Sequence, residues 1–376
     1  MTKLFEPRNL LIRADASTQI GTGHLMRCIA LAQAWQVSGG VVQFVCAEIP
    51  SGLVNRLELE GCKLTKIGSK PGSNADIANT IKSAKHNEAA WVVIDGYHFG
   101  EDYQKALKDA GFRLLCIDDY GHSNHYHADL VLNQNISAEA LFYQKRDPNT
   151  RLMIGVEYAL IRKEFWPWRN WARTNAKNVK NILVTMGGSD PENITFKVIE
   201  ALYIVNMPDV TARILVGSGN ENLHALERFI ENYKENLLIS RGRGHSLRDS
   251  SIKNGLPKID LIRNAFDMPS QMAWSDIAVS AGGSTCWELL FMQTPTAICM
   301  VAENQVEIVE KLDSLNLIEN IGGHNKATVK SIYRSIQKLC LNESYRFNLS
   351  KNCRNIVDGR GTERVLDFMK NYRKIL

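Results

Sequence analysis

Several signals that would assign a protein to a specialised class are missing from this sequence of 376 residues. The eight cysteines form no CxxC pair and most lie within apolar runs, which favours buried free thiols in a reducing compartment. The 45 basic and 40 acidic residues are interspersed without a polybasic run, so the sequence gives no indication of nucleic-acid binding. The apolar run near the N-terminus contains Arg13 and Asp15, so we expect neither a signal peptide nor a membrane span. These absences predict a cytoplasmic protein whose partner is a small molecule, with no nucleic-acid and no membrane partner.

The length and the sequence pattern are those of a two-domain α/β protein. The chain is about twice the usual domain length. Short β-like apolar runs alternate with amphipathic stretches in the first half, and the alternation restarts in the second half. This pattern predicts two Rossmann-like domains, each with a parallel sheet. The expected strands are NLLIRAD, VVQFVCA, AWVVIDG, FRLLCIDD, NILVTM, TARILVG, NLLIS, DIAVS and TAICMV.

The domain boundary is predicted where this alternation stops. Trp166, Pro167, Trp168 and the polar stretch after them interrupt the pattern. We therefore expect a first domain at residues 1–165 and a second at residues 178–376. In sheets of this kind ligands bind outside the carboxyl ends of the strands, so the loops that follow strands are where a site is expected.

The loop after the first strand contains two glycines and a histidine, Gly21, Gly23 and His24, and a helix is expected from about Leu25. The glycines let the backbone approach a ligand, while the free amides of a helix start favour anions and disfavour an imidazolium. His24 should therefore be neutral at pH 7 and able to act as a general base. Considered alone, the short motif is more often a helix-capping loop with a solvated histidine.

A second glycine-rich loop lies between the expected strand DIAVS and a helix. It consists of Gly282, Gly283, Ser284 and Thr285. Its amides and hydroxyls can bind a diphosphate, and Glu288 follows where a carboxylate could accept both ribose hydroxyls. The alternative for Glu288 is a first-turn glutamate that complements the helix dipole.

Two further loops of the second half are weaker candidates. A glycine pair precedes Ser189 and Asp190, and this loop either lines a ligand site or is a turn in which one of these residues caps a helix. Asn304 and Gln305 follow the strand TAICMV, where their side-chain amides could contact a sugar.

Two strands of the first half end in polar residues. Asp95 and Tyr97 follow one strand, and Asp118 and Asp119 follow the next. These are the right places for contacts with a ligand, although aspartates at strand ends also cap helices and turns.

A histidine cluster directly follows the second of these strand ends and suggests a metal. Its members are His122, His125 and His127. Together with Asp118 and Asp119 they lie in one irregular stretch without helical or zinc-finger ligand spacing. The favoured interpretation is a polar loop, and the sequence predicts no metal site.

Seven blocks in a fixed order resemble the nucleotide-sugar hydrolases of the pseudaminic acid pathway, within the MurG-type superfamily of GT-B fold. The blocks are RADASTQIGTGHLMRC, VVIDGYHF, IDDYGHSNHYHADLVLNQN, GVEYALIRKEF, MGGSDPEN, SAGGSTCWELL and AENQ. The resemblance implies a GT-B architecture with an interdomain cleft, a first domain that binds the sugar and a second that binds UDP. It implies hydrolysis of a UDP-linked 2,4-diacetamido-2,4,6-trideoxyhexose to UDP and free sugar, without a metal or another cofactor.

The resemblance also implies roles for single residues. The catalytic base of the family corresponds to His24, which would activate water for inverting attack at the anomeric carbon. Binding positions correspond to Tyr97, to the loop Gly282–Thr285 with Glu288, and to the ENQ block with Asn304 and Gln305.

The sequence departs from the family pattern in one place. Residues 241–258 are polar, glycine-rich and aperiodic, and they intervene before NAFDMPSQM, a segment expected near the uracil. This surface loop leaves uracil recognition and the identity of the sugar open.

Three other functions remain alternatives at this point. A GT-B glycosyltransferase would use the same scaffold with an acceptor in place of water, because fold does not fix function. A non-catalytic nucleotide-sugar-binding protein would not need the GTGH block, which is intact. A hydrolysing epimerase of UDP-N-acetylglucosamine shares the architecture, but its motifs are not seen.

Overall fold

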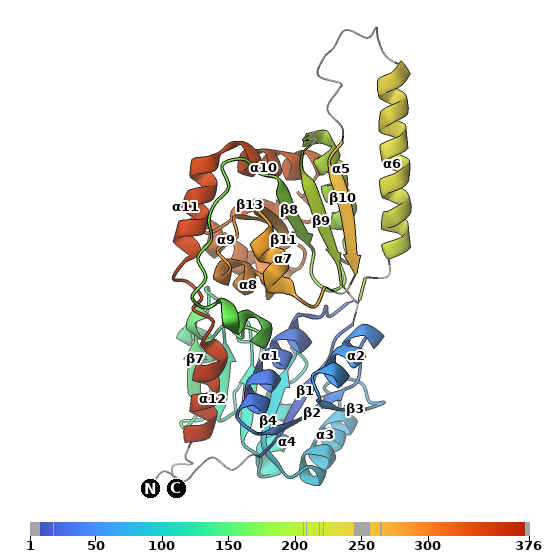
Figure 1. The fold of residues 1–376 in the computed structure, drawn as a ribbon. Helices are drawn as coiled ribbons and strands as arrows, with labels where there is room; N and C mark the ends of the chain where they lie inside the picture. Colours follow the sequence, from blue (N-terminus) through green and yellow to red (C-terminus); the bar gives the residue numbers. More distant parts are fainter. Residues whose placement is uncertain are drawn as a thin grey trace. The chain divides into compact units, whose positions relative to one another are not determined.

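The structure, a computed structural model, describes residues 8–17, 19–205, 207, 209–217, 219–220, 222–243, 256–263 and 265–372. The chain divides into two compact domains (Figure 1). The first consists of residues 1–169 and 356–376, and the second of residues 170–355. Among the described residues, no helix combines the length and the apolar character needed to cross a membrane.

The first domain is built on a parallel seven-stranded sheet with the order β3-β2-β1-β4-β5-β6-β7. Its strands are β1 (Asn9–Ala14), β2 (Val41–Cys46), β3 (Lys63–Lys66), β4 (Ala89–Asp95), β5 (Leu114–Ile117), β6 (Leu130–Asn133) and β7 (Arg151–Ile154). Its α-helices are α1 (Gly23–Val37), α2 (Ser51–Leu59), α3 (Asn74–His86), α4 (Glu101–Asp109) and α12 (Gly361–Asn371). The four strands that the sequence predicted in this part of the chain are confirmed as β1, β2, β4 and β5.

Successive residues of the central strands enter two different cores. Leu10 and Ile12 of β1 pack with α1 and α12 on one face of the sheet. Leu11, between them, belongs to a second cluster that includes Tyr103 and Leu107 of α4. Because both faces are covered, these strands are nearly continuous apolar runs, as is typical of parallel sheets.

The last helix of the described chain belongs to the first domain, whereas the sequence pattern assigned residues 178–376 as a whole to the second. Val365, Leu366 and Met369 of α12 are buried in the core that also contains α1, and the two helices are in contact (Figure 1). At Gly361 an added Cβ would lie 2.2 Å from the carbonyl oxygen of Ala159, so only glycine permits this close approach. The apolar stripe of α12 is visible in the sequence, but a stripe does not specify which of two cores buries it.

The second domain contains a parallel six-stranded sheet with the order β10-β9-β8-β11-β12-β13. Its strands are β8 (Asn181–Thr185), β9 (Thr211–Val216), β10 (Lys258–Arg263), β11 (Ile277–Ala281), β12 (Thr296–Met300) and β13 (Glu319–Gly323). Its α-helices are α5 (Ile194–Val205), α6 (Leu223–Arg243), α7 (Met268–Trp274), α8 (Thr285–Phe291), α9 (Val306–Ser314), α10 (Val329–Leu341) and α11 (Glu343–Cys353). Both sheets have the strand order of a doubly wound fold, which confirms the expectation of two Rossmann-like domains.

The prediction of a strand at NLLIS is wrong. These residues, 236–240, continue the long helix α6, and the strand at this edge of the sheet is β10. A run of adjacent apolar residues cannot distinguish a strand from a helix by periodicity, and no glycine or proline separates this run from the helix before it. Of the predicted loop at 241–258, residues 244–255 lie outside the described part of the chain, and Arg241–Arg243 end α6.

Candidate active site

The strand order of the first domain reverses between β1 and β4, which are hydrogen-bonded neighbours. Helix α1 follows β1 and packs on one face of the sheet, whereas α4 follows β4 and packs on the other. Ligands of doubly wound sheets commonly bind at such a reversal, outside the carboxyl ends of the two strands. The loop after β1 leads to His24 in the first turn of α1, and β4 ends at Asp95. The fold therefore brings together two residues that are 71 positions apart in the chain.

His24 and Asp95 form a buried histidine–carboxylate pair. His24 Nδ1 lies 2.6 Å from Asp95 Oδ1, and both side chains are almost inaccessible to solvent. A nitrogen and a carboxylate oxygen at this distance require a proton between them, so we assign Nδ1 as the protonated ring nitrogen. Nε2 is then left as the proton acceptor, which is the nitrogen that a general base needs.

Arg27 connects this pair to a second carboxylate. Its guanidinium donates to both oxygens of Asp95, at 2.7 Å each, and to Asp119 at 2.6 and 3.1 Å. Burial alone would raise the pKa of Asp95, but the charges and hydrogen bonds of Arg27 and His24 outweigh burial and hold this pKa well below its usual range. The pKa of Asp119 is lowered in the same way, with Arg27 as the main opposing charge. Both carboxylates are therefore ionised.

His24 lies among three charged side chains, the carboxylates of Asp95 and Asp119 and the guanidinium of Arg27. Two carboxylates and one guanidinium leave one negative charge when His24 is neutral. If His24 takes a proton, the cluster becomes neutral, and the new imidazolium lies against Asp95. A carboxylate in this position can orient an imidazole and stabilise an imidazolium.

Tyr97, which the sequence placed at the end of a strand, lies beside this pair. Its ring contacts that of His24 edge to face, with centroids 5.0 Å apart, and its hydroxyl donates to Asp119 Oδ2 at 2.7 Å. The structure therefore brings His24 and Tyr97 to one place, while Asp119 holds the phenol in position.

Helix α1 begins at Gly23, close to the predicted start at about Leu25. Gly21 has a φ of +79°, which favours glycine, and an added Cβ would meet no atom within 4 Å. Gly23 is the first residue of α1, and the residue before it, Thr22, makes no side-chain cap. Thr22 therefore leaves the first amides of α1 uncapped by its own side chain, and the space in front of Gly21 is open among the described residues.

The five residues that suggested a metal in the sequence do not converge. Asp119 joins Arg27, whereas Asp118 accepts backbone amides of its own loop, from Tyr120 at 2.9 Å and Gly121 at 3.1 Å. His122 lies 3.2 Å from Asp118.

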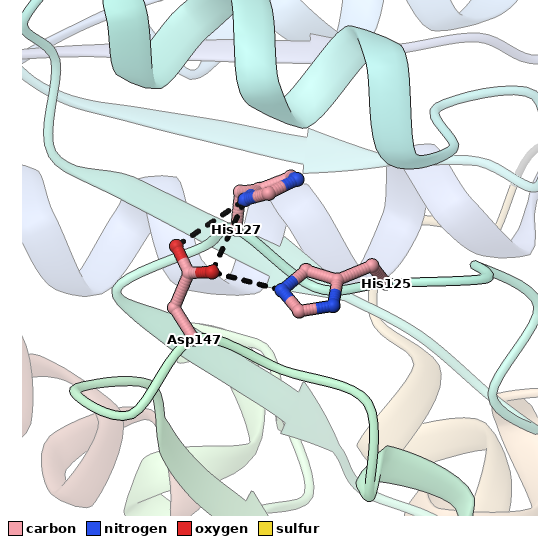
Figure 2. A group of neighbouring side chains, drawn as sticks. All are labelled: His125, His127 and Asp147. Carbon is pink, nitrogen blue, oxygen red and sulfur yellow. Dashed lines mark hydrogen bonds and ion pairs between the residues drawn. The ribbon is translucent and has the colours of Figure 1, made fainter.

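The other two histidines of that cluster pair with a residue that the sequence analysis did not consider. His125 and His127 both contact Asp147, which comes 20 residues after His127 (Figure 2).

In the second domain, the strand order reverses between β8 and β11, and both strands are followed by glycine pairs. After β8, Asp190 accepts the amides of Ile194 at 2.9 Å and Thr195 at 3.0 Å, so it caps the start of α5. Of the two interpretations of this loop, the structure therefore supports the helix cap for Asp190.

The loop Gly282–Thr285 follows β11 and leads into α8. At Gly282 an added Cβ would lie 2.7 Å from Val309, so this glycine is needed for packing against α9. Gly283 has open space around it, with only Gln305 Nε2 at 4.0 Å from an added Cβ. Ser284 precedes the helix without a side-chain cap, and Thr285 begins it.

Gln305 holds two loops together. Its Oε1 accepts the amides of Gly282 at 3.2 Å and Val301 at 2.9 Å. The amide oxygen is therefore engaged within the protein, and the sugar contact expected of this side chain stays a prediction. Its neighbour Asn304 lies in the exposed turn Glu303–Gln305, and Glu288 is largely buried in the first turn of α8.

Arg27 is the main residue that sequence reasoning missed. It follows His24 by three positions on α1, so both side chains are on the same face of the helix. That spacing, next to a predicted cluster of strand-end aspartates, was the available signal. Asn135, whose Nδ2 donates to Asp119 Oδ1 at 3.0 Å, follows β6 and was missed as well.

Comparisons with known proteins agree with this architecture. Residues 212–365 match the model of the glycosyltransferase family 28 C-terminal domain. The crystal structure of MurG from Acinetobacter baumannii superposes with a TM-score of 0.64 and 15% sequence identity over 97% of this chain and 100% of that chain. The fold, two parallel-sheet α/β domains, is that of GT-B structures such as MurG, which confirms the expected fold class.

Two curated relatives cover large parts of the chain. The UDP-2,4-diacetamido-2,4,6-trideoxy-beta-L-altropyranose hydrolase of Campylobacter jejuni is 28% identical over 222 residues, 58% of this chain and 73% of that protein. MJ1062 of Methanocaldococcus jannaschii, an uncharacterized protein, is 25% identical over 302 residues, 79% of this chain. The chain spans only 57% of the length of MJ1062.

Proposed function

We propose that this protein hydrolyses a UDP-linked 2,4-diacetamido-2,4,6-trideoxyhexose to UDP and the free sugar, as a step toward a nonulosonic acid. The observation that carries the proposal is the buried pair of His24 and Asp95 at the carboxyl edge of β1 and β4. The choice of substrate follows the likeness to the Campylobacter jejuni hydrolase and the seven sequence blocks. The cysteine pattern supports a cytoplasmic location.

In the proposed reaction His24 acts as the general base. Nε2 takes a proton from a water molecule, whose oxygen attacks the anomeric carbon of the sugar while the bond to the UDP oxygen breaks. Asp95 holds the imidazolium, and Arg27 keeps Asp95 ionised and in place. Attack from the side opposite UDP inverts the anomeric centre.

The second domain is proposed to hold the nucleotide. The amides around Gly283 and the start of α8 suit the diphosphate, and Glu288 suits the ribose hydroxyls. The first domain, with Tyr97 beside His24 and the loop of Gly21 and Gly23, is proposed to bind the sugar.

A glycosyltransferase is the second candidate function. The match of residues 212–365 to the glycosyltransferase family 28 domain favours it, as does the fold shared with MurG. The same histidine would then take its proton from the hydroxyl of an acceptor in place of water. The two functions therefore differ in the nucleophile and share the base.

The two candidates are separated by incubation with a panel of UDP-sugars in water enriched in ¹⁸O, without any acceptor. We expect release of UDP and free sugar for at least one diacetamido-trideoxyhexose, with one ¹⁸O in the sugar and none in UDP. Label in UDP would show attack at phosphorus and contradict the mechanism. Release of no sugar until an acceptor is added would assign a transferase.

Hydrolysis is expected to continue at an unchanged initial rate in excess EDTA. The proposed base is a histidine held by a carboxylate, and the loop amides supply the charge compensation at the diphosphate. The rate is measured well below the unfolding temperature, so that any effect of chelation on stability does not enter. A rate that falls in EDTA and returns with Zn²⁺ or Mg²⁺ would contradict this prediction.

Replacing Glu288 by alanine is expected to raise KM for the UDP-sugar by about tenfold or more, with a smaller change in kcat. A ribose contact acts equally in the ground state and the transition state, so its loss affects binding more than chemistry. Glu310→Ala, at an exposed position of α9, is the matched control and should leave KM unchanged. If KM is the same in both variants, Glu288 only complements the dipole of α8.

A further inference from the structure

His125, His127 and Asp147 form a group of metal-ligating side chains outside the proposed active site (Figure 2). His125 Nε2 lies 2.8 Å from Asp147 Oδ1, and His127 Nδ1 lies 3.2 Å from the same oxygen. One ligand atom from each residue lies within 4.8 Å of the others. In a tetrahedral zinc site with bonds of about 2.0–2.1 Å, ligand atoms are about 3.3 Å apart, so small side-chain rotations are sufficient to hold an ion.

The backbone fixes these three residues before any ion binds. Tyr126 donates its amide to Lys145 at 2.9 Å and accepts the amide of Asp147 at 3.0 Å. Tyr126 itself is buried in the core. Side chains alternate along an extended segment, so the residues on either side of Tyr126 are expected on the opposite side. Figure 2 shows that His125 and His127 both reach Asp147.

The second ring nitrogen of His127 provides an independent indication. Nε2 is buried without a hydrogen-bond partner, and the carboxylate of Glu101, at the start of α4, lies 4.0 Å away. A histidine that binds a metal through one nitrogen commonly directs the other toward a carboxylate, which orients the ring. His127 has this arrangement, with Asp147 at one nitrogen and Glu101 near the other.

Asp147 is ready to act as an anionic ligand. Its two carboxylate oxygens lie 2.8 Å from His125 Nε2 and 3.3 Å from His127 Nδ1, so they face both imidazoles. Two imidazoles and a carboxylate are ligands typical of Zn²⁺ and related divalent transition ions, whereas Mg²⁺ and Ca²⁺ prefer oxygen alone.

We propose that His125, His127 and Asp147 bind one Zn²⁺ ion, with water completing the coordination and Glu101 orienting His127. The ion would link the segment after β5 to the segment before β7, and thereby stabilise the first domain. The sequence predicted no metal because the histidines and aspartates of residues 118–127 show no regular ligand spacing. Asp147 lies 20 residues after His127 and was not considered. The site shares no residue with the His24 cluster, so binding of zinc and hydrolysis can fail independently.

The test is calorimetric titration of Zn²⁺ into the full chain, without an affinity tag and freed of metal by EDTA and desalting. We expect one ion per chain and a higher melting temperature with zinc. His127→Ala and Asp147→Asn should weaken binding at least about 100-fold and abolish the thermal shift. Glu101→Gln should weaken binding by about tenfold, as expected for an orienting partner.

His224→Ala is the matched control, because His224 is an exposed histidine paired with Glu227 in the second domain. It should bind zinc as the wild type does. Asp147→Asn retains the size and polarity of the half-exposed side chain, so a folded variant is expected, and circular dichroism verifies it. Absence of zinc binding by the wild type, or binding that His127→Ala and Asp147→Asn leave unchanged, would overturn the proposal.

Discussion

Substitution of His24 by asparagine is expected to lower kcat for the UDP-sugar by about 10²- to 10⁴-fold, the usual contribution of a positioned general base. Asparagine keeps a polar side chain of similar reach but cannot accept the proton from water. The affinity for UDP should change little, because the proposed nucleotide contacts are in the second domain. Steady-state kinetics and titration with UDP measure the two quantities separately.

His86→Asn is the control for this variant, since His86 is exposed at the end of α3. Its kcat should equal that of the wild type. A His24→Asn enzyme with nearly normal kcat would be decisive against the assignment. Tyr97, which lies against the same ring, would then be the next residue to test.

Substitution of Asp95 by asparagine should lower kcat almost as strongly, by roughly 10²- to 10⁴-fold, although Asp95 need not touch the substrate. An amide can donate to Nδ1 and so select the tautomer in which Nε2 carries the proton and cannot act as a base. The substitution also removes the negative charge that stabilises the imidazolium. Arg27 keeps its bonds to Asp119, so we expect a folded protein with a lower melting temperature.

Two measurements separate this positioning role from simple destabilisation. The double variant His24→Asn/Asp95→Asn should be no slower than His24→Asn alone, because residues that act as one unit are not additive. Asp109→Asn, which removes a surface partner of Lys105, should leave kcat unchanged. A double variant that loses the product of the two single effects would show that Asp95 acts independently of His24.

The sequence was sufficient to predict the residues at the strand ends, but not how they pair. The alternation of apolar runs with helical stretches predicted β1, β2, β4 and β5, and the ends of β4 and β5 place Asp95, Tyr97 and Asp119 at the carboxyl edge of one sheet. That Asp95 lies next to His24 depends on the hydrogen bonding of β1 to β4, which skips two strands in the chain. Strand order is a property of the assembled sheet and leaves no local pattern.

Errors of the sequence analysis arose where a local pattern fits two structures. The run NLLIS is as compatible with the end of a long helix as with a short strand, and in the structure it is part of helix α6. The apolar stripe of α12 could pack against the core of either domain, and the sequence does not show that it packs in the first. Asp147 could not be recognised as a partner of His127 because strand β6 and the 3₁₀ helix Ala140–Tyr143 lie between them in the chain.

The position of α12 has a consequence for the order in which the protein matures on the ribosome. The proposed catalytic domain is discontinuous, since residues 356–372 complete a core begun by residues 8–169. Domains commonly fold in the order of their synthesis. Here the whole second domain is synthesised before Leu366 and Met369 can pack against α1. The domain whose synthesis begins first therefore completes its folding last. During that interval the apolar face of α1 that α12 later covers is exposed to solvent. A chaperone could bind this face until α12 is synthesised.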